Sequence, residues 1–202
     1  MNAVTAPQEA LQGYYALHSR IYDATRWSFL FGRDAVIHRA AGFIRPKRIL
    51  EVGCGTGRNL NVLRATFPEA EITGIDLSAD MLGIARQRTK GVRLIQRAYD
   101  TPAGGFDLIL CSYALSMFNP GWERAIETAE ADLNPGGIIA VVDFHHTETS
   151  WFEKWMRRNH VRMQGHLWPQ LQQSFTPLSD TRHSAYAGLW HYGMFIGRKR
   201  EG

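Results

Sequence analysis

The chain has 202 residues, of which 45% are hydrophobic and 21% are charged, and its net charge is +4. These values are ordinary for one soluble globular domain, residues 1–202, and the lack of a long apolar run excludes a transmembrane segment. Two cysteines and no secretory leader indicate a cytoplasmic protein, and the positive charge permits binding to anionic lipid or nucleic acid, although no nucleic-acid motif is present.

The first 45 residues are predicted to be helical. Apolar and aromatic residues recur at spacings of three and four from Pro7 to about Thr25, which favours a helix. A second helix is expected to open at Asp34 and to end at Pro46. We interpret residues 1–45 as a helical lid that faces a membrane, because basic residues alternate there with large aromatic ones. Residues 46–202 would form an α/β core.

Strands and helices alternate through most of this core. Strands are predicted at 48–52, 71–76, 92–97, 106–111 and 138–144. Helices are predicted at 58–66, from Ser78 to about 91, and from 120 or 121 to 133, with a turn at 134–137. This alternation predicts an α/β fold with a Rossmann-like, doubly wound, mostly parallel sheet. Beyond it we expect a helix at 151–164, an irregular stretch at 167–179, and strands at 181–187 and 190–197.

The most informative motif follows the first predicted strand. Its glycines are Gly53, Gly55 and Gly57, and the second strand ends in an acid, Asp76. Dinucleotide-binding loops follow the pattern G-x-G-x-x-G, which would place the third glycine where this chain has Arg58. The G-x-G-x-G spacing resembles that of the class I S-adenosylmethionine-dependent methyltransferases. That resemblance implies seven strands with a terminal antiparallel one, whereas the alternative is a purely structural glycine turn.

The resemblance implies S-adenosylmethionine as cofactor and S-adenosylhomocysteine as product. Glycines let the backbone approach the ligand closely, Asp76 would accept hydrogen bonds from the ribose, and Glu51 would reach the ammonium. The acid that many relatives carry after the third strand is either absent or displaced to Asp100, and main-chain amides could serve there instead. The implied cofactor-binding residues are Tyr22, Arg33, Glu51, Gly53, Cys54, Gly55, Thr56, Gly57, Asp76, Leu77, Met81, Ala98, Tyr99 and Ser112.

A more specific resemblance rests on residues 22–33, 112–117 and 142–144. These stretches resemble the bacterial N-methyltransferases of betaine-lipid synthesis, which trimethylate the amine of diacylglyceryl-homoserine to diacylglyceryl-trimethylhomoserine. This implies a lipid substrate at the membrane surface and peripheral association with the inner face of the membrane. Basic and aromatic residues interleaved at 151–162 suit such an interface. The alternatives are phosphatidylethanolamine or a small-molecule amine as acceptor, or a non-catalytic binding module.

The implied reaction is in-line attack of a neutral amine on the methyl group of a sulfonium. The catalytic candidates are Tyr22, Tyr113 and His145, and each also has a structural interpretation as a packed side chain. Aromatic faces favour a quaternary ammonium, and the expected substrate-binding residues are Tyr14, Tyr15, His18, Trp27, Ser116, Met117 and His146. The histidines lack the spacing of metal ligands, so no metal site is expected.

Overall fold

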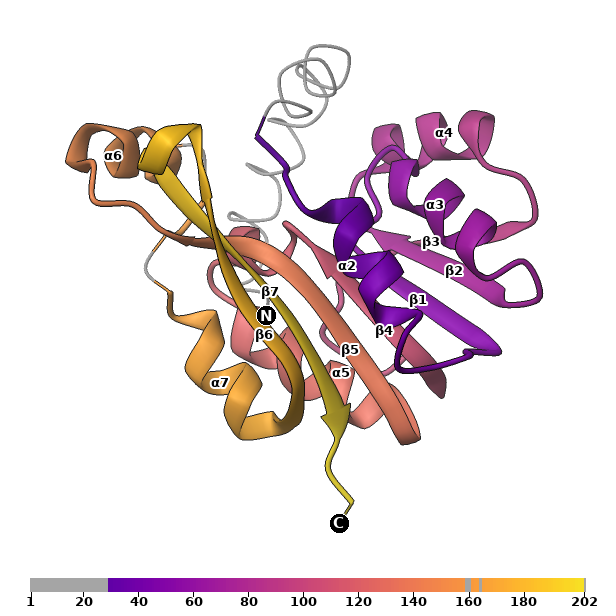
Figure 1. The fold of residues 1–202 in the computed structure, drawn as a ribbon. Helices are drawn as coiled ribbons and strands as arrows, with labels where there is room; N and C mark the ends of the chain where they lie inside the picture. The colour runs from indigo at the N-terminus through magenta and orange to yellow at the C-terminus, as the bar shows by residue number, and fades with distance from the viewer. Residues whose placement is uncertain (1–28, 159–160, 164, 202) are drawn as a thin grey trace, which may run out of the picture.

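The computed structural model describes residues 29–158, 161–163 and 165–201 (Figure 1). The strands are β1 (Arg48–Val52), β2 (Glu71–Asp76), β3 (Val92–Gln96), β4 (Phe106–Ser112), β5 (Leu133–His146), β6 (Phe175–Ala185) and β7 (Trp190–Lys199). The described helices are α2 (Arg33–Ala40), α3 (Arg58–Thr66), α4 (Ala79–Arg88), α5 (Trp122–Asp132), α6 (Ser150–Arg158) and α7 (Leu167–Ser174), with 3-10 turns η1 (Leu115–Met117) and η2 (Tyr186–Gly188).

The strands form one seven-stranded sheet in the order β3-β2-β1-β4-β5-β7-β6. Strand β7 runs antiparallel to both β5 and β6, and the other neighbouring strands pair in parallel. This confirms the predicted doubly wound, mostly parallel sheet with one antiparallel strand. The parallel strands therefore end at one side of the sheet, which we call the carboxyl edge. Ligands of open α/β sheets bind at that edge.

Helices cover both faces of the sheet, with α2 and α3 over one face and α5 and α7 over the other (Figure 1). Because both faces of the sheet are covered, neighbouring residues of β5 are buried on opposite faces. Ala140 and Val142 pack on the α2 side, Ile139 and Val141 pack on the α5 side, and all four are fully buried. A strand covered on both faces reads as an unbroken apolar run, and burying each aliphatic side chain contributes roughly 1.5–3 kcal/mol.

The elements around the glycine motif match their predicted bounds. Strands β1 and β2 and helix α3 begin and end at the expected residues. The Ser78 hydroxyl caps α4 by accepting a hydrogen bond from the Met81 amide (3.3 Å). The predicted turn at 134–137 bulges out of the pairing between β4 and β5. Helix α2 begins at Arg33, one residue before the predicted start at Asp34.

The prediction of an irregular stretch at 167–179 was wrong, because this region forms α7 and the start of β6. Pro169 is the third residue of α7, where no intrahelical hydrogen-bond donor is needed. Pro177 lies in β6, an edge strand whose register shifts at that point. Proline therefore breaks neither element. Helix α6 was predicted to reach about residue 164, but residues 161–163 are not helical.

Candidate active site

The turn after β1 contains three residues in left-handed conformation. Gly53, Gly55 and Gly57 have φ angles of 69°, 52° and 82°, which residues with a Cβ rarely adopt. A Cβ at Gly53 would lie 2.8 Å from the Cβ of Ala114, and one at Gly57 would lie 2.8 Å from Cγ2 of Thr89. Packing within the protein therefore requires glycine at these two positions.

Gly55 faces open space instead. A Cβ at this position would meet no atom within 4 Å, so the turn leaves room for a ligand at its apex. The Gly55 amide donates a hydrogen bond to Asp76 Oδ2 (2.8 Å), and the Ser78 amide donates one to Asp76 Oδ1 (2.8 Å). These bonds hold the carboxylate of Asp76, at the end of β2, beside the open side of the turn.

Glu51 in β1 supplies a second acid. It is 1% exposed, and its Oε1 accepts a hydrogen bond from Asn59 Nδ2 (2.8 Å), whereas Oε2 has no partner among the described residues. Burial raises the pKa of this carboxyl to about 8. A buried carboxylate oxygen without a partner costs free energy unless a cation or donor reaches it. Glu51 therefore fits the ammonium group of an amino-acid moiety.

The residues around the turn thus fit a nucleoside cofactor that carries an amino acid. Glu51 and Asp76 offer acids to its ammonium and its ribose, and the space over Gly55 admits it. Other residues predicted for this ligand lie in the same turn and near the start of α4: Cys54, Thr56 and Met81 are buried, and Leu77 is half-buried. Arg33, at the start of α2, is also half-buried.

The predicted residues after β3 and β4 have other contacts. The Tyr99 hydroxyl donates to Asp132 Oδ2 (2.8 Å), so this hydroxyl is engaged within the protein, and binding through the main chain of Ala98 and Tyr99 stays a prediction. Ser112 Oγ is buried and has no hydrogen-bond partner in the part of the protein that the structure describes. Like Glu51 Oε2, it is a polar atom at the carboxyl edge that a bound ligand could satisfy.

Tyr113 follows β4 and has a positive φ of 53°. Its hydroxyl donates to the Phe31 carbonyl (2.8 Å), and its ring centroid lies 4.7 Å from that of Phe144. Burial raises the pKa of Tyr113 well above that of a free tyrosine. The side chain therefore positions the segment that leads into α2, and its catalytic role stays a prediction.

Asp143, near the end of β5, is a site residue that sequence reasoning named only as part of a longer motif. It is fully buried, and burial raises its pKa to about 6. Its Oδ2 accepts a hydrogen bond from the Ser116 amide (3.1 Å), and its Oδ1 accepts one from the Phe144 amide (2.8 Å). Asp143 thereby holds the loop that carries the predicted substrate-binding residues Ser116 and Met117. An acid that interrupts an apolar strand was the available signal.

The two histidines at the end of β5 form a hydrogen-bonded chain. Arg182 Nε donates to His145 Nε2 (2.9 Å), which leaves the proton of His145 on Nδ1, 2.7 Å from His146 Nδ1. Burial and the charge of Arg182 lower the pKa of His145 to about 4, so it is neutral at neutral pH. Its ring lies 4.8 Å from Trp168 of α7, on the face of the sheet opposite Tyr113. The structure thus separates these two catalytic candidates.

Charged contacts join α2 to α3. Arg58 donates two hydrogen bonds to Asp34, from Nη1 to Oδ1 (2.5 Å) and from Nη2 to Oδ2 (3.0 Å). Arg33 Nε donates to the Leu30 carbonyl (3.1 Å), and its charge interacts with Glu51. Burial lowers the pKa of Arg33, and the neighbouring Arg58 lowers it further. The residue that breaks the dinucleotide pattern, Arg58, therefore links the predicted lid to the helix after the glycine turn.

The remaining predicted site residues divide by position. His146 stacks on His191, with 4.3 Å between the ring centroids. Five others lie outside the described residues: Tyr14, Tyr15, His18, Tyr22 and Trp27. Among the residues that the structure describes, no group of His, Cys, Asp or Glu is arranged to hold a metal ion, and no helix has the length and apolar character needed to cross a bilayer.

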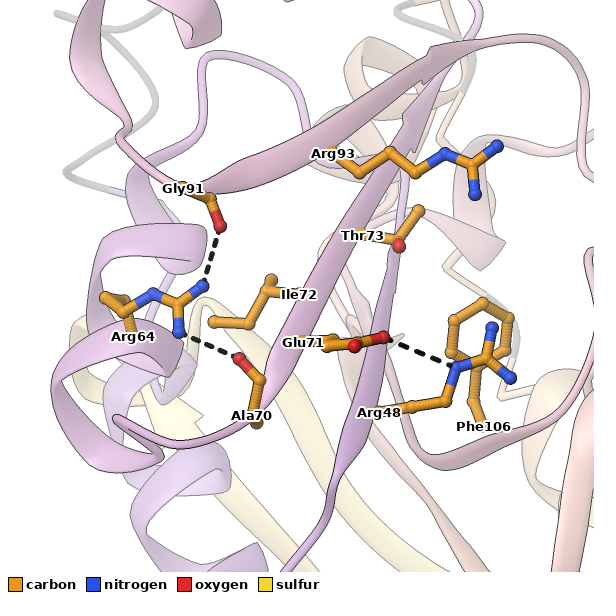
Figure 2. Close-up of a pocket in the computed structure, with 9 residues that line it drawn as sticks. All are labelled: Arg48, Arg64, Ala70, Glu71, Ile72, Thr73, Gly91, Arg93 and Phe106. Atoms are coloured by element: carbon orange, nitrogen blue, oxygen red, sulfur yellow. Dashed lines mark hydrogen bonds and ion pairs between the residues drawn. The ribbon is translucent and has the colours of Figure 1, made fainter.

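A cavity of about 300 Å³ lies at the end of the sheet away from the carboxyl edge, by the amino ends of β1, β2 and β3 (Figure 2). Two of its three arginines, Arg48 and Arg64, contact neighbouring residues of the protein. Arg64 donates to the carbonyls of Ala70 (2.8 Å) and Gly91 (2.8 Å), and Arg48 Nε lies 3.9 Å from Glu71 Oε2. These contacts brace the amino ends of the strands, so we do not assign this cavity to the candidate active site.

Residues 23–186 match a protein family described as methyltransferase domain. The chain belongs to this family. The match includes the glycine turn, Asp76 and the loop after β4, so membership confirms the broader resemblance to methyltransferases that the G-x-G-x-G motif predicts.

Among curated proteins, a trans-aconitate 2-methyltransferase from Rhodopseudomonas palustris (strain BisB18) is 35% identical to this methyltransferase domain over 98 residues. The aligned part covers 48% of this chain and 38% of that protein. This chain therefore matches well under half the length of that curated relative.

Two solved structures share the fold. The N-methyltransferase NodS from Bradyrhizobium japonicum WM9, solved with S-adenosylhomocysteine, has a TM-score of 0.69 at 19% identity and covers 84% of this chain and 86% of its own. The other is a Burkholderia thailandensis 1,6-didemethyltoxoflavin-N1-methyltransferase, solved with 1,6-didemethyltoxoflavin and S-adenosylhomocysteine. Its TM-score is 0.72 at 19% identity, and the match covers 100% of this chain and 93% of that one. Both confirm the class I methyltransferase fold.

Proposed function

We propose that this methyltransferase domain transfers methyl groups from S-adenosylmethionine to the amine of diacylglyceryl-homoserine and so forms the betaine lipid diacylglyceryl-trimethylhomoserine. The observation that carries the transferase chemistry is a pair of acids near the glycine turn: Asp76, bonded to the Gly55 amide at the open apex, and Glu51, whose Oε2 has no partner among the described residues. Two structural relatives were solved with S-adenosylhomocysteine, the product that this cofactor leaves. The cofactor is S-adenosylmethionine, in agreement with the prediction.

The cofactor, when bound, supplies an activated methyl group, and the residues of the protein bind and orient it. Asp76 is held by the Gly55 and Ser78 amides, so its carboxylate is positioned before the ribose arrives. Glu51 lies buried with one oxygen free among the described residues, and an ammonium there would favour its charged form. Asp143 fixes the loop after β4, where we place the acceptor amine.

The acceptor amine must lose a proton before it attacks. Burial and a nearby positive charge both disfavour an ammonium, so the site itself lowers the pKa of the amine. A strong base is therefore not required. His145 is poorly suited to the task because its pKa is about 4 and Arg182 occupies its Nε2. We retain Tyr22 and Tyr113 as candidates to relay this proton, which for Tyr113 means accepting it as its own hydroxyl proton passes on, because burial keeps that hydroxyl protonated.

An aromatic cluster beside the loop after β4 supports an amine that becomes quaternary. The ring centroids of Tyr113 and Phe144 lie 4.7 Å apart, those of Phe144 and Trp190 lie 5.2 Å apart, and Phe31 stacks on Tyr192 at 6.2 Å. Tyr113, Phe144 and Trp190 are buried, so the partly exposed Phe31 and Tyr192 are the members that could meet a quaternary ammonium, and an aromatic face stabilises such a cation by roughly 0.5–2 kcal/mol. The lipid headgroup is inferred from the resemblance at residues 22–33, 112–117 and 142–144.

A small-molecule acceptor is the second candidate. It is favoured by the curated relative, which is named for trans-aconitate, and by the solved relative that holds 1,6-didemethyltoxoflavin. A soluble acceptor would need no membrane, and the aromatic residues before α2 would then act as an ordinary lid.

The test is methyl transfer from a labelled donor to separate acceptor preparations. We would offer diacylglyceryl-homoserine, phosphatidylethanolamine, lipid without an amine headgroup, and a panel of soluble amines and carboxylates, with Asp76→Ala as the inactive control. Label in the homoserine lipid alone, through three additions, is the expected result. Label only in a soluble acceptor would replace the lipid proposal. Donor binding without transfer to any acceptor would contradict a catalytic role.

A further inference from the structure

Helix α6 exposes a stripe of aromatic and basic side chains. Trp151, Lys154, Trp155 and Arg158 are all exposed, and the spacing i, i+3, i+4, i+7 puts them on one face of the helix. Trp151 is 63% exposed and Trp155 is 47% exposed. Tryptophan is usually well covered in a folded protein, so two on one exposed stripe call for a partner.

A different face of α6 joins the helix to the hydrophobic core. Helix α6 is anchored by its other face, where Phe152 and Met156 are buried in the same core cluster as Trp190. Because Phe152 and Met156 are also four residues apart, they form a separate stripe on the helix. The buried stripe attaches α6 to the domain, and the exposed stripe faces outward, with Trp155 in ring contact with Phe29 (6.0 Å) and Phe152 (5.7 Å).

Two other segments extend the exposed aromatic surface. Tyr186, in the turn η2 between β6 and β7, is 51% exposed, and Phe31, before α2, is 39% exposed. The ring centroids of Phe31 and Tyr186 lie 5.6 Å apart, and Phe29 lies 6.0 Å from both Tyr186 and Trp155. Figure 1 shows α6 beside the turn between β6 and β7. We call Phe31, Trp151, Trp155 and Tyr186 the aromatic surface.

The aromatic surface adjoins the candidate active site. Strands β5 and β6 are parallel to β1 and β2, so α6, which follows β5, and η2, which follows β6, both lie at the carboxyl edge. Phe31 also connects directly to the loop after β4, because its carbonyl accepts the hydrogen bond from Tyr113. Whatever covers the aromatic surface therefore meets the same edge as Gly55 and Asp76.

The charges on α6 indicate which partner fits. The helix carries Lys154, Arg157 and Arg158 against one acid, Glu153. Tryptophan and tyrosine favour the headgroup layer of a bilayer, where the ring is buried and its polar end stays wet, and basic side chains bind anionic lipid phosphates. A neutral protein surface would cover the tryptophans but would leave these cations without counter-charges.

We propose that the aromatic surface docks this methyltransferase on an anionic bilayer, with Trp151 and Trp155 at headgroup depth and Lys154 and Arg158 against lipid phosphates. The role of this docking rests on the proposed function, because docking would present lipid headgroups to the carboxyl edge for methylation. Binding to the bilayer is nevertheless a property of the surface alone, so it can be measured without methyl transfer.

The experiment uses the full chain with vesicles that contain no amine acceptor. Vesicles of phosphatidylcholine with phosphatidylglycerol, and of phosphatidylcholine alone, are compared by co-sedimentation. Quenching of tryptophan fluorescence by brominated lipid measures insertion. We expect binding to the anionic vesicles, and we expect Trp151→Ala/Trp155→Ala and Lys154→Gln/Arg158→Gln each to weaken it roughly tenfold or more. The matched control is Arg86→Gln/Lys90→Gln, which removes two exposed cations on and after α4 and should bind like wild type.

Each outcome decides the proposal. The proposal is overturned if the wild-type protein does not bind anionic vesicles or if brominated lipid does not quench its tryptophan fluorescence. It is also overturned if the tryptophan double variant binds these vesicles as tightly as wild type does. The last result would place the contact elsewhere in the chain. Far-UV circular dichroism and thermal unfolding establish that the variants are folded. Vesicle binding without transfer to any lipid would contradict the proposed acceptor and leave the docking surface standing, so the two failures are distinguishable.

Discussion

The two halves of the carboxyl edge are built in different ways. The half at β1 and β2 draws Glu51, Gly55 and Asp76 from one βαβ unit and leaves a buried acid oxygen and an open backbone apex for a ligand. The half at β4 and β5 brings together distant segments, and Tyr113 and Asp143 use their polar groups within the protein, whereas Ser112 Oγ has no partner among the described residues. The first half is prepared for polar recognition of a cofactor, and the second is shaped by packing.

Asp76→Ala is the strongest test of the half of the carboxyl edge at β1 and β2. We expect the affinity for S-adenosylhomocysteine, measured by calorimetry, to fall by about 1–3 kcal/mol, because charged hydrogen bonds to the ribose are lost. The control is Asp107→Ala. Asp107 likewise accepts from two backbone amides, of Lys47 (2.8 Å) and Arg48 (3.0 Å), but at the amino ends of the strands. The control should lose stability and keep its affinity; unchanged affinity in Asp76→Ala would remove Asp76 from the site.

The pH dependence of stability tests Glu51. Its carboxyl has a pKa of about 8 in the folded protein, above the ordinary value of 4.5. The folded state therefore binds more protons than the unfolded state between these values, and the free energy of unfolding falls as pH rises through that window. Glu51→Gln should remove this fall and stabilise the ligand-free protein by roughly 1–3 kcal/mol at the alkaline end. Denaturant unfolding across the window measures it.

The same carboxyl predicts a proton released on cofactor binding. An ammonium next to Glu51 favours its charged form, so S-adenosylhomocysteine should displace a proton near neutral pH. Calorimetry in buffers with different protonation enthalpies detects this release, which Glu51→Gln should abolish. Asp143→Asn is the matched control, because Asp143 is also a buried acid with a raised pKa. Release that persists in Glu51→Gln would assign the proton to another group.

Tyr113→Phe tests the half of the carboxyl edge at β4 and β5. The Phe31 carbonyl loses its hydrogen bond, so we expect a loss of about 1 kcal/mol in the free energy of unfolding. If the hydroxyl only positions the loop, turnover should change by a few-fold, whereas loss of a general base costs roughly 100-fold or more. Tyr99→Phe is the control, since its hydroxyl donates to Asp132, the last residue of α5. A loss of turnover in Tyr113→Phe alone would establish the catalytic role.

Asp34→Asn gives the smallest expected effect. The side chains of Asp34 and Arg58 are 45% and 47% exposed, so the pair should contribute about 0.2–1 kcal/mol and weaken with salt. Thermal unfolding at low and high salt measures the contribution, with Glu127→Gln of the exposed Arg124–Glu127 pair as control. If the free energy of cofactor binding drops more than the free energy of unfolding, the contact between α2 and α3 affects cofactor binding at the glycine turn.

Much of the cofactor half was predictable because its signals are local. Left-handed backbone at Gly53 and Gly57 needs glycine, and a helix start needs a cap such as Ser78, whatever the rest of the chain does. The wrong assignments arose where context overrides a local rule. Pro169 and Pro177 sit at a helix start and in an edge strand, and neither position demands a main-chain donor.

The sequence by itself determined the order of strands and helices through β5, the glycine turn with Asp76, and hence the methyltransferase fold, because backbone conformation and short spacings depend on neighbouring residues. Only the tertiary structure decided that Arg58 holds Asp34, that Arg182 occupies His145, that Tyr113 bonds Phe31, and that two tryptophans of α6 stay exposed. Those contacts join residues far apart in the chain, and burial, which sets their pKa values and their availability, exists only once the layers have packed.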